Sequence, residues 1–222
     1  MNKVLIIVIL TAIIAFTYSC KKETEEPMDL GLDYFPTEKG FYQVYKVDSI
    51  VYDDYFNTID TFHFYVKMVI QDKFTDNSNN DAYRWRKYSK MDSTSWKFCD
   101  NYTVTKTTQR LETTIQNKRL INLIFPVVAG KSWDLNAKNT ENEVSSIYTD
   151  VDFSESLLGN TYDNCAKANY QEEVNLIQEF VNHETFSKNI GMIHRRSIHK
   201  EIKNNKTRGY DVEYIISEYG KE

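Results

Sequence analysis

Apolar and polar residues alternate along most of the chain after residue 33, which is the period of a β-strand. The clearest example is the stretch 61–71, whose odd-numbered positions are mostly polar. Its even-numbered positions carry Phe62, Phe64, Val66, Met68 and Ile70. This pattern predicts a long strand with one face turned to a core and the other to solvent.

Weaker alternation predicts further strands elsewhere in the chain. These cover residues 41–47, 50–56, 83–89, 95–105, 111–115 and 145–153. The segment 172–183 fits either a helix or a strand by its apolar spacing, and we favour the strand.

Two polar segments predict turns between neighbouring strands. Residues 76–81 connect the long strand to the strand that contains Trp85. Residues 204–209, whose Asn and Gly tolerate positive φ, join the last two predicted strands, 192–203 and 210–219. We therefore expect the chain to end in a hairpin.

These elements define the expected fold class. Antiparallel strands with one apolar face must cover that face with a second sheet, with helices or by closure, and helical segments are few here. The sequence predicts a mainly β protein with a single antiparallel β domain, built as a curled sheet or a half-open or closed barrel. The length of residues 34–222 suits one domain.

The first nineteen residues have the pattern of a secretion signal. Lys3 precedes the apolar run 4–16, which is too short to span a bilayer comfortably, and Ser19 stands directly before Cys20. In this arrangement the sequence resembles a bacterial lipoprotein. The resemblance implies cleavage after residue 19, acylation of Cys20 with chains such as palmitate, and anchoring in a membrane. An uncleaved anchor helix, or an ordinary signal with a coincidental cysteine, is the alternative.

Residues 20–33 follow as a charged segment without apolar periodicity, which predicts a flexible tether. Glu23, Glu25 and Glu26 resemble the acidic export signals of surface-exposed lipoproteins of Bacteroidota. The alternative is a solvated spacer that leaves the domain in the periplasm. We expect a lipid anchor in the outer membrane and leave its face open.

A second resemblance begins at Tyr34-Phe35-Pro36 and includes Gly40. This start resembles that of a group of uncharacterised Bacteroidota outer-membrane lipoproteins, and later stretches carry the same likeness. Those stretches are 125–133, 159–165 and 189–193. The resemblance implies a fold and a location but no chemistry. Independently of it, Tyr34 and Phe35 can close an open end of the β structure, and Gly40 suits a tight turn.

Charge and motifs exclude several functions. After removal of residues 1–19 the chain carries 26 Lys and Arg against 32 Asp and Glu, a net charge of −6, so we expect no nucleic-acid partner. The Gly-x-Ser-x-Gly and His-Glu-x-x-His motifs are absent from the sequence. The acidic turn 76–81 lacks the Gly and the final Glu of a calcium loop. We therefore expect no metal, no cofactor and no enzyme activity.

One cluster of positive charge stands out in this acidic chain and consists of His194, Arg195, Arg196, His199 and Lys200. Such a cluster can contact an anionic lipid headgroup, a glycan or an envelope protein, although a solvated strand face explains it equally simply. His194 and His199 are five residues apart, so on one strand they point to opposite faces and do not ligate a metal together.

Two cysteines remain once Cys20 is assigned to the lipid. Cys99 and Cys165 form an even pair in an oxidising compartment, and a disulfide between them is one interpretation. Two buried free thiols are the other. No motif places a histidine beside either cysteine, so a catalytic thiol is disfavoured.

Two classes of function remain from the sequence. The first, which we favour, is an accessory or binding lipoprotein of the cell envelope, with a carrier of lipophilic ligands as one form of it. An incompletely filled pocket in the β structure would support that form. The second is a hydrolase that uses two facing carboxylates, for which the sequence offers no pair.

Overall fold

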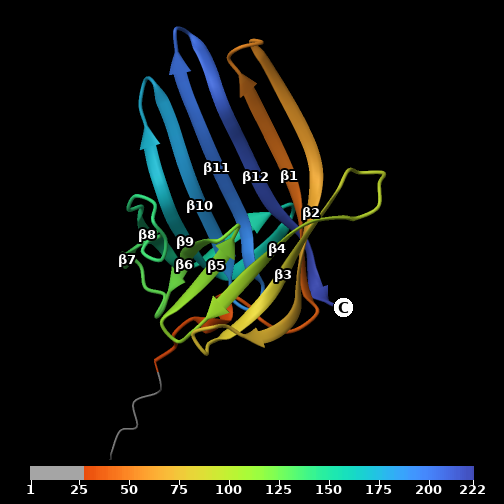
Figure 1. The fold of residues 1–222 in the computed structure, drawn as a ribbon, viewed down its shortest axis with the longest axis vertical. Coiled ribbons are helices and arrows are strands. Elements are labelled where there is room, and N and C mark those ends of the chain that lie inside the picture. Colours follow the sequence, from red (N-terminus) through yellow and green to blue (C-terminus); the bar gives the residue numbers. More distant parts are fainter. Residues whose placement is uncertain (1–27) are drawn as a thin grey trace, which may run out of the picture.

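The computed structural model describes residues 28–222, which form one antiparallel sheet of twelve strands (Figure 1). The short 3₁₀ turn η1, Leu32–Tyr34, is the single helical element of this range, and no helix within it is long and apolar enough to cross a bilayer. The strands are β1 Phe41–Asp53, β2 Thr58–Thr75, β3 Asp81–Lys90, β4 Lys97–Lys106, β5 Arg110–Ile115, β6 Lys118–Ile124, β7 Ser132–Asp134, β8 Ser145–Leu157, β9 Asn160–Val174, β10 Gln178–Ser187, β11 Gly191–Lys203 and β12 Lys206–Lys221. The predicted fold class is confirmed.

The first and last strands of the chain, β1 and β12, lie side by side in the middle of the sheet. β1 pairs with β12, β2 to β6 follow on one side, and β11 back to β7 follow on the other. The two edges approach each other, because the Ile121 N–H donates to the Leu135 carbonyl over 2.9 Å and the Trp133 indole N–H donates to the Ile121 carbonyl over 2.7 Å. The sheet therefore curls into a nearly closed barrel, which covers its apolar face without a second layer.

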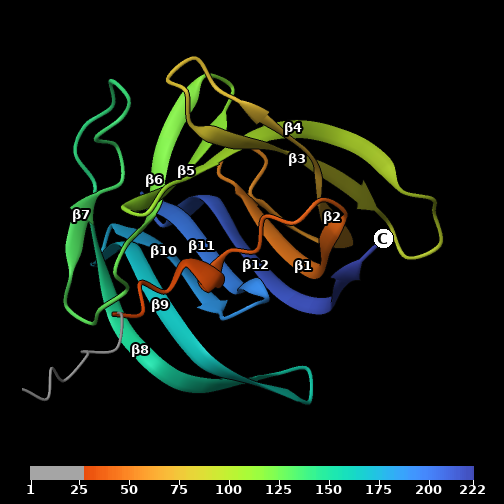
Figure 2. The same cartoon turned by 90° about the horizontal axis from the view of Figure 1, so that it is seen from below.

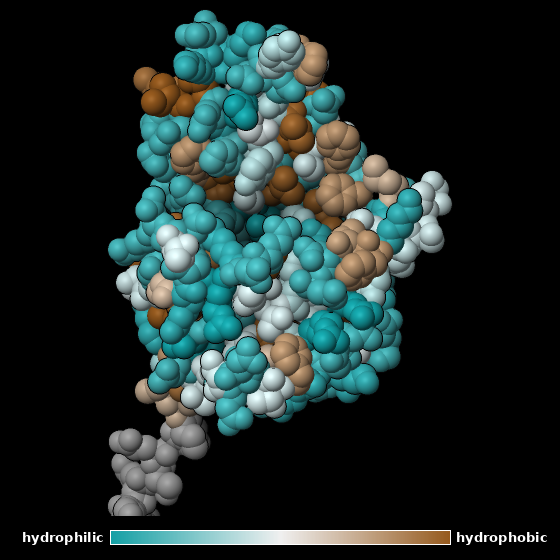
Figure 3. Space-filling view, in the orientation of Figure 1, coloured by the Kyte–Doolittle hydropathy of each residue, from teal (hydrophilic) through white to brown (hydrophobic). Residues whose placement is uncertain are grey.

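Unequal strand lengths give the barrel two different ends. β2 has 18 residues and β12 has 16, whereas β5 has 6 and β6 has 7. The long strands extend beyond the short ones as an open, curved sheet, and Figure 3 shows hydrophobic side chains along this upper part. Val66 and Ile70 are buried in the lower part of the barrel, where the short strands complete its wall. Phe62, on the same face of β2, is 44% exposed. The predicted inward face of β2 is correct, but only the second half of the strand is buried on that face.

The segment before β1 crosses the other end of the barrel as a floor (Figure 2). Tyr34 and Phe35 are almost fully buried there, at 1% and 4% exposure. The Lys106 ammonium donates to the carbonyl of Leu32 over 3.2 Å and to that of Phe35 over 2.8 Å. Gly40, with φ of +81°, makes the turn into β1. The expected closure by Tyr34 and Phe35 is confirmed.

Two predicted boundaries are wrong. The strands expected at 41–47 and 50–56 are one strand, β1, and the chain turns only after Asp53. The expected loop 204–209 is a tight turn at Asn204 and Asn205, both with positive φ, and the following residues already belong to β12. In both cases cross-strand pairing extends through polar positions, because a backbone ladder does not depend on side-chain polarity.

Two other predictions are confirmed. The turn near residues 76–81 joins β2 to β3, with the Asp76 carboxylate accepting from backbone N–H groups of Ser78 and Asn80 over 2.9 Å each. The segment 172–183 is extended: β9 continues to Val174 and β10 begins at Gln178. A short bend between them accounts for the spacing that also fitted a helix.

Candidate functional site

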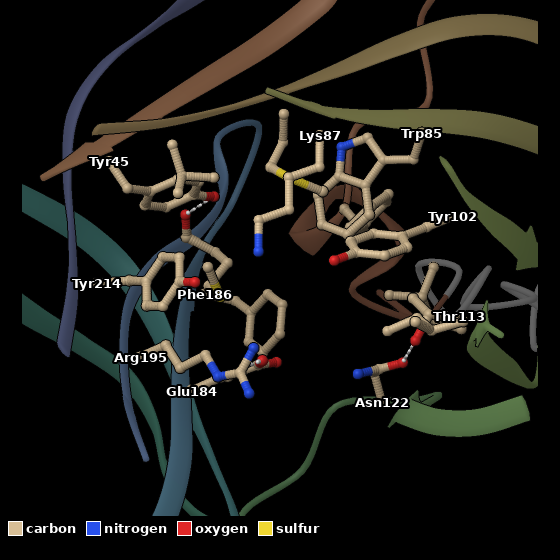
Figure 4. A pocket seen from close by; sticks show the side chains of 16 residues that line it. Tyr45, Trp85, Lys87, Tyr102, Thr113, Asn122, Glu184, Phe186, Arg195 and Tyr214 are labelled. Atoms are coloured by element: carbon tan, nitrogen blue, oxygen red, sulfur yellow. Dashed lines mark hydrogen bonds and ion pairs between the residues drawn. The ribbon is translucent and has the colours of Figure 1, made fainter. Parts of the chain in front are cut away.

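The lower part of the barrel, where the short strands complete its wall, contains an incompletely filled cavity of about 100 Å³ (Figure 4). Side chains from both halves of the sheet converge on it, because successive strands of a curled sheet turn every second residue inward. Its aromatic lining consists of Phe35 from the floor and Tyr45, Trp85, Tyr102, Phe186 and Tyr214 from the strands. The site thus has the mostly apolar lining of a small-ligand pocket.

The aromatic rings support one another by edge-to-face contacts. The centroid of Trp85 lies 5.4 Å from that of Phe35 and 6.0 Å from that of Tyr102, at interplanar angles of 78° and 64°. Tyr45 and Tyr214 form a similar pair at 6.0 Å on the opposite wall. The Tyr45 hydroxyl donates to the Met192 carbonyl over 3.0 Å. These contacts hold the walls in place, so the cavity is pre-formed.

One buried carboxylate, Glu184 on β10, lies at the edge of the cavity with 8% exposure. Its Oε2 accepts from the Tyr170 hydroxyl over 2.9 Å, and its Oε1 lies 3.8 Å from the Nε of Arg195 on the neighbouring strand. Burial raises the pKa of Glu184, whereas Arg195 and Tyr170 act to lower it. When it is ionised, Glu184 is a counter-charge for Arg195 inside the barrel.

Lys87 on β3 points its ammonium into the middle of the cavity (Figure 4). The Nζ lies 6.0 Å from the ring centroid of Tyr214. Burial opposes the charge, but Tyr214 and Tyr102 outweigh that effect and raise the pKa of Lys87 above its usual value. The residue is a cation at neutral pH, half-buried among aromatic rings.

The sequence predicts the inward-facing Val66 and Met68, the closing residue Phe35 and the clustered Arg195, which all line the cavity, but the other lining residues were not identified from it. Trp85 was expected only as part of an aromatic strand, and Lys87 was not singled out. The sequence does contain a feature that indicates Lys87. This residue is two positions after Trp85 on the same strand, so it lies on the face that the alternation predicts to be buried. A charged residue on that face is costly to bury and indicates a site.

The positive cluster expected from the sequence is divided between the two faces of β11. Arg195 and His199 face the concave side, where Arg195 lines the cavity and His199 stacks between Phe180 and Tyr210 at centroid distances of 4.4 and 5.8 Å. His194 points to the other face, as the spacing predicted.

The basic residues on the convex face are paired with carboxylates. An Arg196 NH2 group lies 3.1 Å from Asp211, and the Lys200 ammonium lies 3.2 Å from Glu179 and 3.6 Å from Asp211. These ion pairs neutralise the charge that the sequence alone suggests. Of the five clustered residues, only Arg195 and His199 face the concave side.

His194 bridges two carboxylates on the convex face. Its Nδ1 lies 3.1 Å from Glu155 and its Nε2 lies 3.0 Å from Glu213. Burial acts to lower the pKa of His194, but the two carboxylates outweigh it and raise the pKa. His183 lies 5.7 Å away, ring to ring, and its pKa is lowered to about 4 by burial, by Lys167 and by His194. The pKa values of the two histidines are therefore shifted in opposite directions.

The cysteines are not brought together. Cys99 on β4 is exposed, with its Sγ 3.0 Å from the Ser89 hydroxyl, and Cys165 on β9 is buried, with its thiol donating to the Tyr162 carbonyl over 3.2 Å. Both are free thiols in the structure, one exposed and one buried, which matches neither a disulfide nor a pair of buried thiols, the two interpretations that the sequence leaves open. Cys20, the expected site of acylation, lies outside the described residues.

The described part of the chain contains no group of three or more His, Cys, Asp or Glu side chains arranged to hold a metal ion. The candidate site is therefore the aromatic cavity with its two cations and one carboxylate.

Comparison with known proteins adds a fold likeness. No family model matches the chain, and no curated protein matches it. Similar solved structures include a protein described as a lipoprotein from Parabacteroides distasonis, with 13% identity over 88% of this chain and 100% of that one, at a TM-score of 0.43. Another is a protein described as exported, with a YmcC-like fold, from Bacteroides fragilis, with 8% identity over 84% and 98% of the two chains and a TM-score of 0.46. At these scores the function rests on the residues of this chain alone.

Proposed function

We propose that this chain is a lipid-anchored protein of the outer membrane that binds a small ligand in the cavity of its barrel. The observation that carries the binding role is the pre-formed cavity of about 100 Å³, with aromatic walls and a few converging polar groups. The anchor rests on the sequence, in which Cys20 directly follows the apolar leader.

The end of the barrel at which the chain enters suits a binding protein that is tethered through its N-terminal segment. Residues 28–35 enter at the floor of the barrel, and the open, curved sheet lies at the opposite end (Figures 1 and 2). A domain held by its floor presents its open end away from the membrane surface. Ligand can then approach without passing between the domain and the lipid headgroups.

The size of the cavity limits the ligand. Pockets for drug-sized ligands usually measure about 300 to 1,000 Å³, whereas an apolar cavity of about 150 Å³ accepts benzene. At about 100 Å³ this cavity is smaller still, so it takes at most a group of about one ring or a short chain and is too small for the two acyl chains of a membrane lipid. The carrier role considered from the sequence is therefore narrowed to small apolar groups.

The hydrolase alternative gains no support at this site. Glu184 is the one carboxylate among the residues that line the cavity, and glycoside hydrolysis of the common kind needs two. Glu184 also has its oxygens directed to Tyr170 and Arg195. A binding role therefore accounts better for the geometry than a hydrolytic one.

The anchor is tested by the variant Cys20→Ala. We expect it to leave the membrane fraction, and mass spectrometry of the wild-type protein to find a mature chain that begins at an acylated Cys20. A mature chain that begins elsewhere, or carries no acyl group, contradicts the anchor.

The binding role is tested with a neutral aromatic probe, benzyl alcohol, added to a fragment of residues 21–222, which retains every strand and contact described above. Saturation-transfer NMR should detect binding. Ile115→Trp, which enlarges a side chain at the cavity, should abolish it, whereas Ile147→Trp on β8, outside the lining, should not. No binding, or equal binding by Ile115→Trp, contradicts the proposal.

A further inference from the structure

Two cations and one carboxylate line the cavity, so its polar part carries an excess of positive charge. Arg195 faces Glu184 at 3.8 Å, a distance too long for a hydrogen bond, and the Nε of Arg195 is buried without a hydrogen-bond partner. Its side chain keeps 39% of its surface accessible. Arg195 therefore retains N–H donors for a further acceptor.

Lys87 is the second cation and has no carboxylate of its own. Within residues 28–222 its ammonium takes part in no ion pair, and its close neighbours are the aromatic rings of Tyr214 and Tyr102. A half-buried ammonium without a counter-ion is costly unless an anion or water reaches it. The side chain extends into the empty volume (Figure 4), where an incoming anion can meet it.

A third donor points to the same space. The Thr113 hydroxyl donates to Oδ1 of Asn122 over 2.7 Å, and this bond fixes the amide so that its NH₂ group turns to the cavity (Figure 4). Donors thus outnumber acceptors around the empty volume. A ligand that supplies acceptors satisfies them, whereas a ligand with donors does not.

The rest of the lining selects for an apolar body. Trp85, Phe186 and Met68 contribute rings and a thioether around the cavity, and Phe35 closes it from below. A volume of about 100 Å³ admits a group close to one ring in size. Anionic and apolar parts must therefore lie close together in the same small molecule.

We propose that the cavity binds a small carboxylate with an aromatic or short apolar body, held by Lys87 and Arg195 at its charged end and by the aromatic walls at the other. This inference rests on the proposed binding role and names its ligand class. The carboxylate would replace the missing counter-ion of Lys87 and accept from the Arg195 guanidinium, which suits two acceptor oxygens.

Three probes of nearly equal shape and different charge test it: benzoate, benzamide and benzamidine. Each is titrated into the fragment 21–222 at neutral pH, and its dissociation constant is measured by NMR. We expect benzoate to bind about tenfold or more tightly than benzamide, the difference that a hydrogen bond between charged partners makes. We expect benzamidine to bind most weakly.

The role of Lys87 is tested with Lys87→Met, which keeps an unbranched side chain one atom shorter and removes the charge. This variant should lose the preference for benzoate and keep the binding of benzamide. Lys90→Met is the matched control, because Lys90 lies on the same strand but outside the cavity, near Tyr65 and Trp96. It should bind all three probes as the unchanged protein does.

The outcomes separate the two proposals. Equal binding of benzoate and benzamide leaves the binding role standing and overturns the carboxylate class. A preference for benzamidine also overturns it and identifies Glu184 as the anchor. Failure of all three probes to bind overturns the binding role together with the inference.

Discussion

The hydroxyl of Tyr170 lies 2.9 Å from Oε2 of Glu184, at the edge of the cavity. Both side chains are buried, at 2% and 8% exposure, and the other carboxylate oxygen faces Arg195. Tyr170 thus fixes the carboxylate that in turn orients the guanidinium. The position of the cation at the cavity depends on a hydroxyl on another strand.

Tyr170→Phe should destabilise the fold by about 1–3 kcal/mol, because it leaves a buried carboxylate with one donor fewer. Urea denaturation followed by circular dichroism measures the change. Tyr55→Phe is the control, since Tyr55 is 83% exposed and its loss of a hydroxyl should change stability by less than about 0.5 kcal/mol. Equal stability of the two variants would show that the buried bond contributes nothing.

The pair His183 and His194 should give opposite pH dependences. The folded pKa of His194 is raised, so its stabilising contribution is complete below the ordinary value of 6.5 and is lost as the pH rises through the folded pKa. The folded pKa of His183 is about 4, so its contribution is complete above 6.5 and is lost as the pH falls from 6.5 towards 4.

NMR titration of the imidazole protons tests this prediction. One histidine should titrate near 4 and another above 6.5. His194→Gln should raise the pKa of His183, because it removes a positive neighbour while the carboxylate of Glu155 remains. An unchanged pKa of His183 in this variant would mean that His194 has no part in lowering it, and that burial and Lys167 account for the shift.

The two free thiols should differ sharply in reactivity. Cys99 is exposed, whereas Cys165 is buried and burial raises the pKa of its thiol. A thiol reagent such as DTNB should therefore modify one cysteine quickly in the native fragment 21–222 and the second only after unfolding. Cys99→Ser should abolish the fast reaction. A native fragment in which neither thiol reacts would indicate the disulfide considered from the sequence.

Gly40 should be much less replaceable than Gly130. A Cβ at Gly40 would lie 2.3 Å from the backbone oxygen of Glu222, whereas a Cβ at Gly130, with nearly the same φ, meets nothing within 4 Å. Gly130→Ala should cost about 1–2 kcal/mol from backbone strain alone. Gly40→Ala should cost about 1–3 kcal/mol more from the contact. Equal losses in urea denaturation would show that the backbone at Glu222 moves aside freely.

The fold was predictable because strand alternation reports directly on a buried face. The sequence of β2 places Val66, Met68 and Ile70 in phase, and all three are buried, together with the out-of-phase Val69. How far along β2 the inward face is buried could not be predicted from the sequence of β2 alone. Phe62 is exposed because β5 and β6 are short and leave the end of β2 uncovered, a property of other parts of the chain.

The candidate site was less accessible to sequence reasoning than the fold. Its residues are separated by up to 179 positions, from Phe35 to Tyr214, and only the curl of the sheet brings them together. The members of the basic cluster on β11 are close together in sequence, which suggests a shared surface. Alternation then sends Arg195 to the cavity and Arg196 to Asp211 on the outside, so adjacency in sequence does not imply a shared surface.

The floor segment belongs to both of the roles proposed above, the lipid anchor and the binding cavity. Phe35 is at once a wall of the cavity and the continuation of the residues that lead back to Cys20. A fragment that began at Phe41 would be a tube open at both ends. In the lipid-anchored form proposed above, a pull on the anchor would first meet the contacts of Asp29 with Lys188 and of Leu30 with Val127, and only then the bonds that Lys106 makes to Leu32 and Phe35 beneath the cavity.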